Sequence, residues 1–173
     1  MKKIVITLAM SALFWACNDY HKCEFNEQES TLKCSDGVYD IVKVDGRNWY
    51  QENSHFYTDF SYCYKDDFKL CADYGRLYTW DATKKVCPLG WHVLRKNEIE
   101  SLVALGEFGK LNIPKAGFRY RGDDYVDRDV SARMWLEDEF DAARAYMISI
   151  ADGNVTIEHF NKDIAASVRC VQN

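Results

Sequence analysis

Apolar positions over most of the chain fall in short runs typical of β-strands. Residues 38–44 form one run rich in branched side chains, and Trp49-Tyr50 belong to the next. Asp45-Gly46 stands between them and favours a two-residue hairpin, because glycine tolerates the positive φ of a type I′ turn. Further runs lie at residues 116–120, 132–136, 145–150, 155–160 and 167–171, with the turn sequence Asp152-Gly153-Asn154 between the third and the fourth.

Two segments instead show helical spacing. The first is predicted at residues 73–83, where positions i, i+3, i+4 and i+7 place on one face Tyr74, Leu77, Tyr78 and Asp81. We interpret this aromatic stripe as core, and Cys87-Pro88 ends the run. The second helix is expected to begin at an Asn97 cap with Glu100 three residues later, and to end at Gly106. Its apolar face carries Ile99, Leu102 and Val103.

The first residues form a continuous apolar run behind a short basic segment. Lys2 and Lys3 precede residues 4–15, of which only Thr7 and Ser11 are polar. This run is shorter than the roughly 20 residues that a membrane-spanning helix needs, but it has the length of the apolar region of a secretory signal. We therefore expect residues 1–16 to be a signal peptide.

The residues at the end of this run resemble a bacterial lipoprotein signal. Ala16 is the small residue that a signal peptidase needs before its cut, and Cys17 follows directly. Phe14 and Trp15 depart from the usual leucine and small residue. The resemblance implies that Cys17 carries a lipid and anchors the chain to the cell envelope, at the outer membrane or the cell surface. Plain secretion and an uncleaved anchor are the alternatives.

Cysteine usage fits an exported chain. Seven cysteines are an odd number where cysteines normally pair, and assigning Cys17 to the lipid leaves six. Six cysteines allow 15 pairings. We expect two short loops and one long clasp, formed by Cys23–Cys34, Cys63–Cys71 and Cys87–Cys170. The rival interpretation, a metal site, lacks a CxxC pair and a Cys/His cluster with zinc spacing, so we expect no metal.

Residues 17–35 are polar and show no clear periodicity. We interpret them as a tether with a small disulfide loop that lifts a domain at residues 36–173 off the membrane. The alternative is a first edge element of that domain.

Composition supports one folded domain and excludes one class of partner. Apolar residues make up 47% and aromatic residues 14% of the chain, which is enough for a real core. The net charge is -5, and no basic run stands outside Lys2-Lys3. Nucleic acid is therefore excluded as a partner, because its binding needs a basic face.

Five blocks in order resemble the Fibrobacter succinogenes major paralogous domain, over residues 36–173. They are the hairpin that begins at Asp36-Gly37, Trp49, and the runs CYKDDFKLCADYGRLYTW from Cys63, CPLGWH from Cys87 and SVRCV from Ser167. The chain departs from the family at residues 93–95, where the family has Leu-Pro-Ser, and at Ile99, where it usually has Trp. It departs again at residues 134–137, where the family has a Trp-Ser-Ser-Thr-like run. These departures affect local packing more than the fold.

The resemblance implies an α+β fold similar to the C-type-lectin-like group, which also contains the formylglycine-generating enzymes. That fold has two helices around a small, twisted, irregular antiparallel sheet, with the termini together, and here it would be stapled by disulfides. The family is built from exported and surface-lipoprotein chains.

An acidic loop is the first candidate for a site. Its carboxylates could offer oxygen ligands to Ca²⁺, and they belong to Asp123, Asp124, Asp127 and Asp129. The spacing fits neither an EF-hand nor the sugar-binding signatures of calcium lectins. We favour a solvated loop in which Arg121 and Arg128 pair with these acids. Arg121-Gly122-Asp123 also spells the adhesion tripeptide, and so short a match arises easily by chance.

Catalysis finds little support in the residues. A formylglycine-generating type of enzyme needs reactive cysteines, and every cysteine after Cys17 has an expected partner. No G-x-S-x-G elbow is present. The histidines are scattered, at His21, His55, His92 and His159, and we expect His55 and His92 to be structural. We therefore expect neither an enzyme nor a cofactor.

The remaining expectation is a noncatalytic surface module that binds a protein or a polysaccharide. Sugar and protein recognition often uses amphipathic rings, and the candidates are Tyr57, Phe60, Tyr62, Tyr120 and Tyr125. The alternative is a structural spacer or envelope assembly component without a soluble ligand.

Overall fold

A computed structural model describes residues 21–173 of the chain. The predicted signal peptide and the lipid acceptor Cys17 lie outside the described residues. Within residues 21–173, no helix is long and apolar enough to cross a membrane.

The predicted hairpin is confirmed and lies at the centre of a sheet. β3 (Gly37–Val44) and β4 (Arg47–Tyr50) pair antiparallel, with Val44 opposite Arg47. Asp45 and Gly46 have φ of 49° and 73°, as a type I′ turn requires.

This hairpin belongs to a six-stranded sheet with the order β1-β2-β3-β4-β14-β7. Its other strands are β1 (Cys23–Asn26), β2 (Thr31–Cys34), β7 (Trp91–Val93) and β14 (Cys170–Gln172). The described part of the segment interpreted as a tether is thus an edge element of the sheet, the alternative that the sequence left open. It joins the domain because Leu32 packs in the core and Cys23 lies opposite Cys34 in the ladder.

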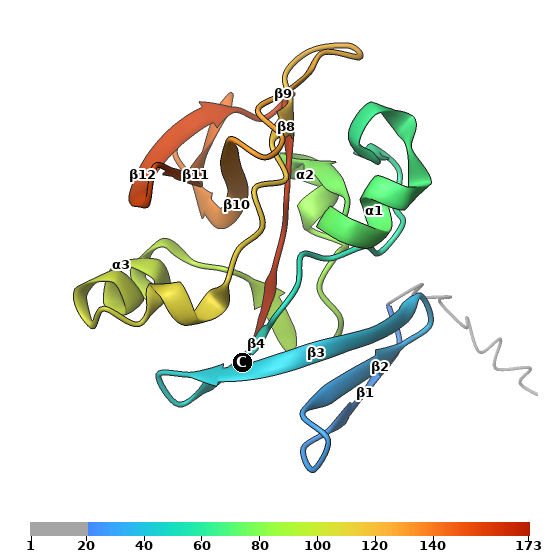
Figure 1. Cartoon of the computed structure of the whole chain (residues 1–173), viewed down its shortest axis with the longest axis vertical. Coiled ribbons are helices and arrows are strands. Elements are labelled where there is room, and N and C mark those ends of the chain that lie inside the picture. The colour runs from blue at the N-terminus through green and yellow to red at the C-terminus, as the bar shows by residue number, and fades with distance from the viewer. Residues whose placement is uncertain (1–20) are drawn as a thin grey trace, which may run out of the picture.

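Two further sheets complete the fold (Figure 1). One consists of β10 (Ser131–Glu139), β11 (Arg144–Ala151) and β12 (Asn154–Asn161), all antiparallel. The other has the order β5-β6-β13-β8-β9, from β5 (Ser61–Tyr62), β6 (Leu77–Thr79), β8 (Phe118–Arg119), β9 (Tyr125–Val126) and β13 (Ala165–Ala166). Residues 21–173 are therefore α+β with mostly antiparallel sheets, and they form three sheets where one small sheet was expected.

The predicted helix at residues 73–83 is wrong. α1 (Phe68–Tyr74) ends where that helix was to begin, and β6 and the short α2 (Trp80–Thr83) follow. Gly75 breaks the helix with φ 78°, and a Cβ there would come within 2.6 Å of the Asn53 Cβ. Leu77 and Tyr78 are both buried on successive residues of a strand, so their helical spacing was a coincidence.

The second predicted helix is present but begins earlier. α3 (Lys96–Ala104) is capped by Arg95 instead of Asn97. The reason is Glu98, whose carboxylate accepts a 2.9 Å hydrogen bond from the Arg95 backbone N–H and closes a capping box. Gly106, with φ 69°, follows the end of the helix as expected. Two short 3₁₀ turns, η1 (Tyr64–Asp66) and η2 (Phe108–Leu111), complete the helical elements of the described residues.

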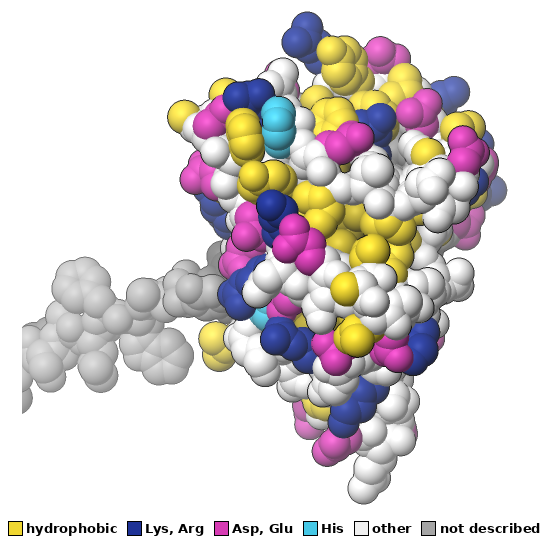
Figure 2. Space-filling view, turned by 90° about the vertical axis from the view of Figure 1, so that its left-hand side faces the viewer, with side chains coloured by type: hydrophobic (Ala, Val, Ile, Leu, Met, Phe, Trp, Pro, Cys, Tyr) yellow, Lys and Arg dark blue, Asp and Glu magenta, His cyan; other side chains and the backbone are white. Residues whose placement is uncertain are grey.

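The described residues bury two large apolar clusters. Trp135 and Tyr50 belong to one, and Trp49 and Ile99 belong to the other. On the side of the molecule where β12 and α3 lie, hydrophobic side chains gather at the centre and charges of both signs surround them (Figure 2). Each cluster therefore draws on residues distant in sequence.

Three disulfides connect the described cysteines, and they are the expected pairs Cys23–Cys34, Cys63–Cys71 and Cys87–Cys170. The last spans 83 residues and joins the segment before β7 to β14. Cys170 is fully buried in the first cluster. This bond therefore fixes the end of the chain inside the core.

Replacing Cys87 and Cys170 by alanine is expected to lower the free energy of unfolding by about 4–5 kcal/mol, because the long loop restricts the unfolded chain most. The matched control replaces Cys23 and Cys34, 11 residues apart, and should lose only about 2–3 kcal/mol. Chemical denaturation of the purified oxidised proteins measures both. A larger loss for the control pair would contradict the expectation.

Candidate functional site

Three of the five predicted binding rings lie on the segment that leads into and includes β5, which we call the aromatic loop (residues 56–62). Tyr57 and Phe60 each expose 68% of their surface, and Tyr62 is half-buried. The loop thus presents to solvent two large rings that are three positions apart in the sequence.

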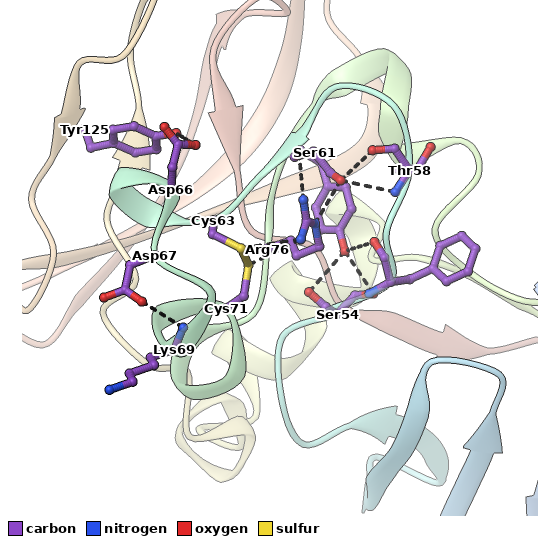
Figure 3. Close-up of a disulfide and its surroundings, with 12 residues drawn as sticks. Ser54, Thr58, Ser61, Cys63, Asp66, Asp67, Lys69, Cys71, Arg76 and Tyr125 are labelled. Atoms are coloured by element: carbon purple, nitrogen blue, oxygen red, sulfur yellow. Dashed lines mark hydrogen bonds between the residues drawn. A yellow bond between two sulfur atoms is a disulfide. The ribbon is translucent and has the colours of Figure 1, made fainter.

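A buried arginine holds this loop in place (Figure 3). Arg76 donates from Nε to Ser61 Oγ and from Nη2 to the Ser61 carbonyl, both at 2.9 Å. Its Nη1 lies 3.4 and 3.5 Å from the sulfurs of Cys63 and Cys71. The guanidinium is also 5.1 Å from the ring of Tyr57. Among residues 21–173 no carboxylate pairs with Arg76. Its N–H groups instead hold the aromatic loop in place.

Further hydrogen bonds fix the backbone of the aromatic loop at both ends. The Ser61 hydroxyl donates to the Thr58 carbonyl at 2.6 Å, which closes a tight turn. At the start of the loop, the buried Tyr78 hydroxyl donates to the Phe56 carbonyl at 2.7 Å. The Thr79 N–H donates to the Phe60 carbonyl at 3.1 Å. The exposed rings are therefore carried by a well-braced backbone.

Phe60 has an unusual backbone conformation. Its φ is 61°, in the left-handed region, which a bulky residue adopts at a cost of about 1–3 kcal/mol. Because the ring is exposed, its packing offsets little of this conformational cost. Strain of this kind tends to concentrate at binding and catalytic sites.

The other two predicted rings lie at the opposite edge of the sheet that contains β5, Tyr125 on β9 and Tyr120 directly after β8. Tyr125 is buried, packs on Tyr64 and donates to Asp66 at 3.1 Å. Burial and the Asp66 charge raise the pKa of Tyr125 to about 12. Tyr125 is therefore not an exposed binding ring, because it completes the small cluster behind the Cys63–Cys71 loop. Tyr120 is 45% exposed and packs edge-on against Phe118.

The acidic loop does not bring its carboxylates together. Asp123 pairs with Arg119 at 3.4 Å. Asp129 accepts from the Tyr74 hydroxyl at 2.6 Å and pairs with Arg128 at 3.3 Å. Arg121 instead lies over the ring of Tyr120. The one group of close metal-type ligands among residues 21–173 is His21, Cys23 and Cys34, and both of its sulfurs are in a disulfide.

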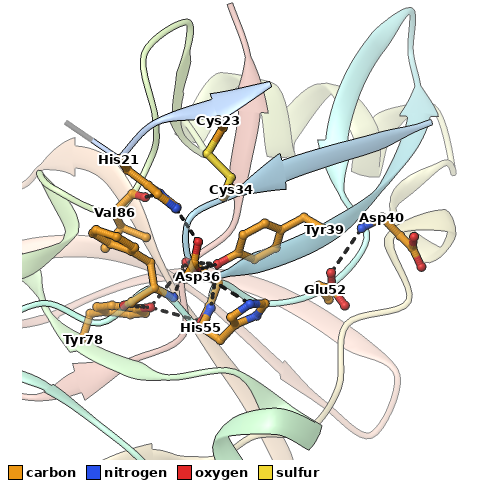
Figure 4. A network of polar contacts seen from close by, with 12 residues as sticks. His21, Cys23, Cys34, Asp36, Tyr39, Asp40, Glu52, His55, Tyr78 and Val86 are labelled. Atoms are coloured by element: carbon orange, nitrogen blue, oxygen red, sulfur yellow. Dashed lines mark hydrogen bonds and ion pairs between the residues drawn. A yellow bond between two sulfur atoms is a disulfide. The ribbon is translucent and has the colours of Figure 1, made fainter. Parts of the chain in front are cut away.

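A buried polar network joins the start of the described chain to the aromatic loop (Figure 4). Asp36 is 2.5 Å from both His21 Nε2 and the Tyr39 hydroxyl, which donates to it. His55 lies 3.7 Å from the same carboxylate. The ring of His21 stacks on Phe56 at 3.8 Å. This network therefore helps to hold the start of the aromatic loop in place.

The electrostatics of the network favour a charged Asp36. Burial alone would raise the pKa of Asp36, but the hydrogen bonds from His21 and Tyr39 and the charge of His21 outweigh it and lower the pKa. Burial and the bond to Asp36 raise the pKa of Tyr39. The nearby Ser54 is fully buried and contacts the hydroxyls of Tyr39 and Tyr78. The network thus offers no exposed nucleophile.

Sequence reasoning missed a cleft of about 740 Å³ at the end of the six-stranded sheet, which we call the polar cleft. It is lined by Gly46, Arg47, Asn48, His92, Arg95, Gln172 and Asn173. These residues come from four separate parts of the chain, and each looks like an ordinary surface residue. Only His92 drew attention beforehand, as a packed imidazole. No local signal could have found this site.

No protein-family model, curated protein or solved structure matches the chain. The proposals below therefore depend on the residues and geometry of this chain.

Replacing Asp36 by asparagine is expected to destabilise the protein by about 1–3 kcal/mol at pH 7, because it removes the charged acceptor of two hydrogen bonds. The pKa of Asp36 is lowered on folding, so its contribution is present above the ordinary value of 3.8 and is lost as pH falls through the folded value. The difference between the two proteins should therefore shrink in acid. Urea denaturation from pH 7 to pH 3 measures it, with the exposed Asp40→Asn as control. A gap that stays constant with pH would refute this.

Proposed function

We propose that this chain is a noncatalytic lipoprotein module of the cell surface that binds a protein or a polysaccharide through its aromatic loop. The observation that carries the proposal is Phe60. It holds an exposed ring on a strained backbone, in a loop that Arg76 braces from behind. Backbone strain of this kind tends to concentrate at binding and catalytic sites, which supports a binding role for the loop.

Preorganisation is the physical reason why such a loop suits binding. A flexible loop loses about 0.5–1.5 kcal/mol for each side chain that it orders on association. The Arg76 contacts and the Cys63–Cys71 bond fix this backbone before any ligand arrives. Tyr57 and Phe60 are therefore ready to bury their rings against a partner, and aromatic rings are the residues that most often dominate interfaces.

The described cysteines and serines support a role without catalysis. Each cysteine of residues 21–173 is in a disulfide, so none is a free thiol. Ser54, which lies in the polar network, is fully buried. A formylglycine-generating activity would need a reactive cysteine that these residues do not offer.

The disulfides also support export. Such bonds persist in oxidising compartments and are rare in the cytosol. Pairing of six cysteines leaves Cys17 over, where the lipoprotein signal places its acceptor. The lipid would attach the domain to the envelope ahead of the edge strand β1.

Membership of the Fibrobacter paralogous family, with its C-type-lectin-like fold, is part of the proposal. Three of the resembling blocks coincide with contacts that close the domain. The block from Cys63 forms the disulfide turn and β6. The blocks from Cys87 and Ser167 supply β7 and β14, which pair and share the long disulfide.

Loss of the exposed rings should separate binding from folding. A glycan array and a pull-down followed by titration of the purified ligand would measure affinity. Tyr57→Ala with Phe60→Gly is expected to weaken binding about tenfold or more. Phe60→Gly alone should raise the unfolding midpoint, because glycine relieves the positive φ.

Phe68→Ala is the matched control, since Phe68 is also a highly exposed phenylalanine but lies outside the aromatic loop. It should leave affinity unchanged. Binding that is indifferent to the loop variants would contradict the proposal, and silence in both assays would favour the spacer alternative.

Lipidation can be tested apart from binding. Intact mass of the mature chain should show a first residue Cys17 that carries a lipid, and three disulfides. The Cys17→Ser variant should lose the lipid and move from the detergent phase to the aqueous phase on phase partition. A wild-type protein without lipid mass would refute the anchor and leave the binding proposal standing.

A further inference from the structure

The side chains that line the polar cleft can all form hydrogen bonds, and Gly46 is the one lining residue without a side chain. Gly46, Arg47 and Asn48 come from the end of the β3–β4 hairpin, His92 from β7, and Gln172 from β14. Arg95 stands at the start of α3. Apart from one glycine, every residue that lines the cleft is polar, and none of them is acidic. Pockets for apolar ligands are lined mostly by hydrophobic side chains, so this cleft suits a polar ligand.

A buried carboxylate holds the cleft in shape from behind. Glu98 accepts hydrogen bonds from Arg47 Nη1 and from the backbone N–H of Arg95, the latter at 2.9 Å. His92 Nε2 lies 3.0 Å from the same carboxylate. The side chain of Glu98 is 4% exposed, so its charge is used by these partners and is not offered to a ligand.

Contacts between the lining residues fix their positions further. Asn48 Nδ2 donates to Gln172 Oε1 at 2.7 Å. His92 Nδ1 lies 2.6 Å from Asn173 Oδ1. The amides on the wall of the cleft thus form an ordered array of donors and acceptors, which is the kind of surface that recognises hydroxyl groups.

Two arginines give the cleft its charge. Arg47 and Arg95 are about half exposed, and each uses one nitrogen on an acid, Glu98 for the first and Glu137 for the second. Their remaining N–H groups are open to a ligand. A guanidinium binds a carboxylate through two parallel hydrogen bonds, so the cleft is suited to a ligand that carries carboxylates.

We infer that the polar cleft binds an acidic saccharide, a sugar chain whose units carry carboxylates. Arg47 and Arg95 would pair with the carboxylates, and Asn48, Gln172 and Asn173 would bond the hydroxyls. A peptide is disfavoured because no apolar side chain lines the cleft to receive an anchor residue. The inference rests on the proposed binding role but uses none of the aromatic loop.

An adjoining hollow extends the cleft along the molecule. It has a volume of about 270 Å³, shares His92 with the polar cleft, and is lined by Trp80, Trp91 and Glu137 among others. A chain of more than one unit therefore fits the combined site better than a single sugar.

Isothermal titration with tetragalacturonate tests this inference, with its methyl ester and hexaglutamate as matched probes. The acidic oligomer is expected to bind, and its affinity should fall about tenfold in Arg95→Gln, because that change removes a charge-assisted hydrogen bond to the carboxylate. Asn48→Asp, which adds a negative charge to the wall, should weaken binding as much. Binding should also weaken between low and high salt, because the contact is between exposed charges.

Arg144→Gln is the matched control. Arg144 is also about half exposed and is paired with a half-exposed acid, Asp141, but lies away from the cleft. It should bind like the wild type, and unfolding midpoints check that every variant is folded. Equal binding of the methyl ester, equal or tighter binding of hexaglutamate, or no binding of tetragalacturonate would each overturn the inference. Tetragalacturonate binding should survive loss of Tyr57 and Phe60, because neither residue lines the cleft. Loss of binding in that variant would overturn the inference, while the proposed role of the aromatic loop is tested separately by its own ligand.

Discussion

The disulfide between Cys87 and Cys170 is the constraint on which the rest of the structure depends. It holds β14 between β4 and β7, and so closes the six-stranded sheet around the last residues of the chain. Both of the proposed binding surfaces depend on that closure. Gln172 lines the polar cleft two residues after the bond. The Val168 carbonyl, two residues before it, accepts a 2.8 Å hydrogen bond from Ser54 at the approach to the aromatic loop.

Two buried arginines, Arg169 and Arg76, also hold parts of the structure together, and both donate their hydrogen bonds to neutral groups. Arg169 donates to the Asn53 side chain at 3.0 Å and to the carbonyls of Leu111 and Asn112, so it joins β14 to the end of η2. Arg76 donates to the hydroxyl and the carbonyl of Ser61, and so holds the aromatic loop. A buried charge without an acid partner is costly unless its donors are all satisfied. Such a residue therefore tolerates few positions of its partners, and we expect both regions to be rigid for this reason.

Sequence predicted what depends on neighbouring residues and failed where distant ones decide. The Asp45-Gly46 and Asp152-Gly153 turns were found because their positive φ values need particular residues. The helix at residues 73–83 was wrong because the close approach of Asn53 to Gly75 ends α1, and strand pairing with β13 claims Tyr78. Tyr125 was placed on the surface because nothing local shows that Tyr64 and Asp66 cover it. Part of the aromatic loop was found, because aromatic residues outside a regular apolar pattern can be recognised in a sequence.

The polar cleft shows most clearly which features the sequence alone could not predict. Arg47, His92 and Gln172 are scattered along the chain, and only the pairing of β14 with β4 and β7 brings them together. Glu98, the partner of Arg47 and His92, looked like an ordinary helix acid in the sequence. Its capping role and its bonds to these two residues arise from the same carboxylate. One buried acid thus sets both where α3 begins and where the side chains of Arg47 and His92 point. A site built in this way is rigid because moving any of its members would leave the Glu98 charge buried with fewer partners.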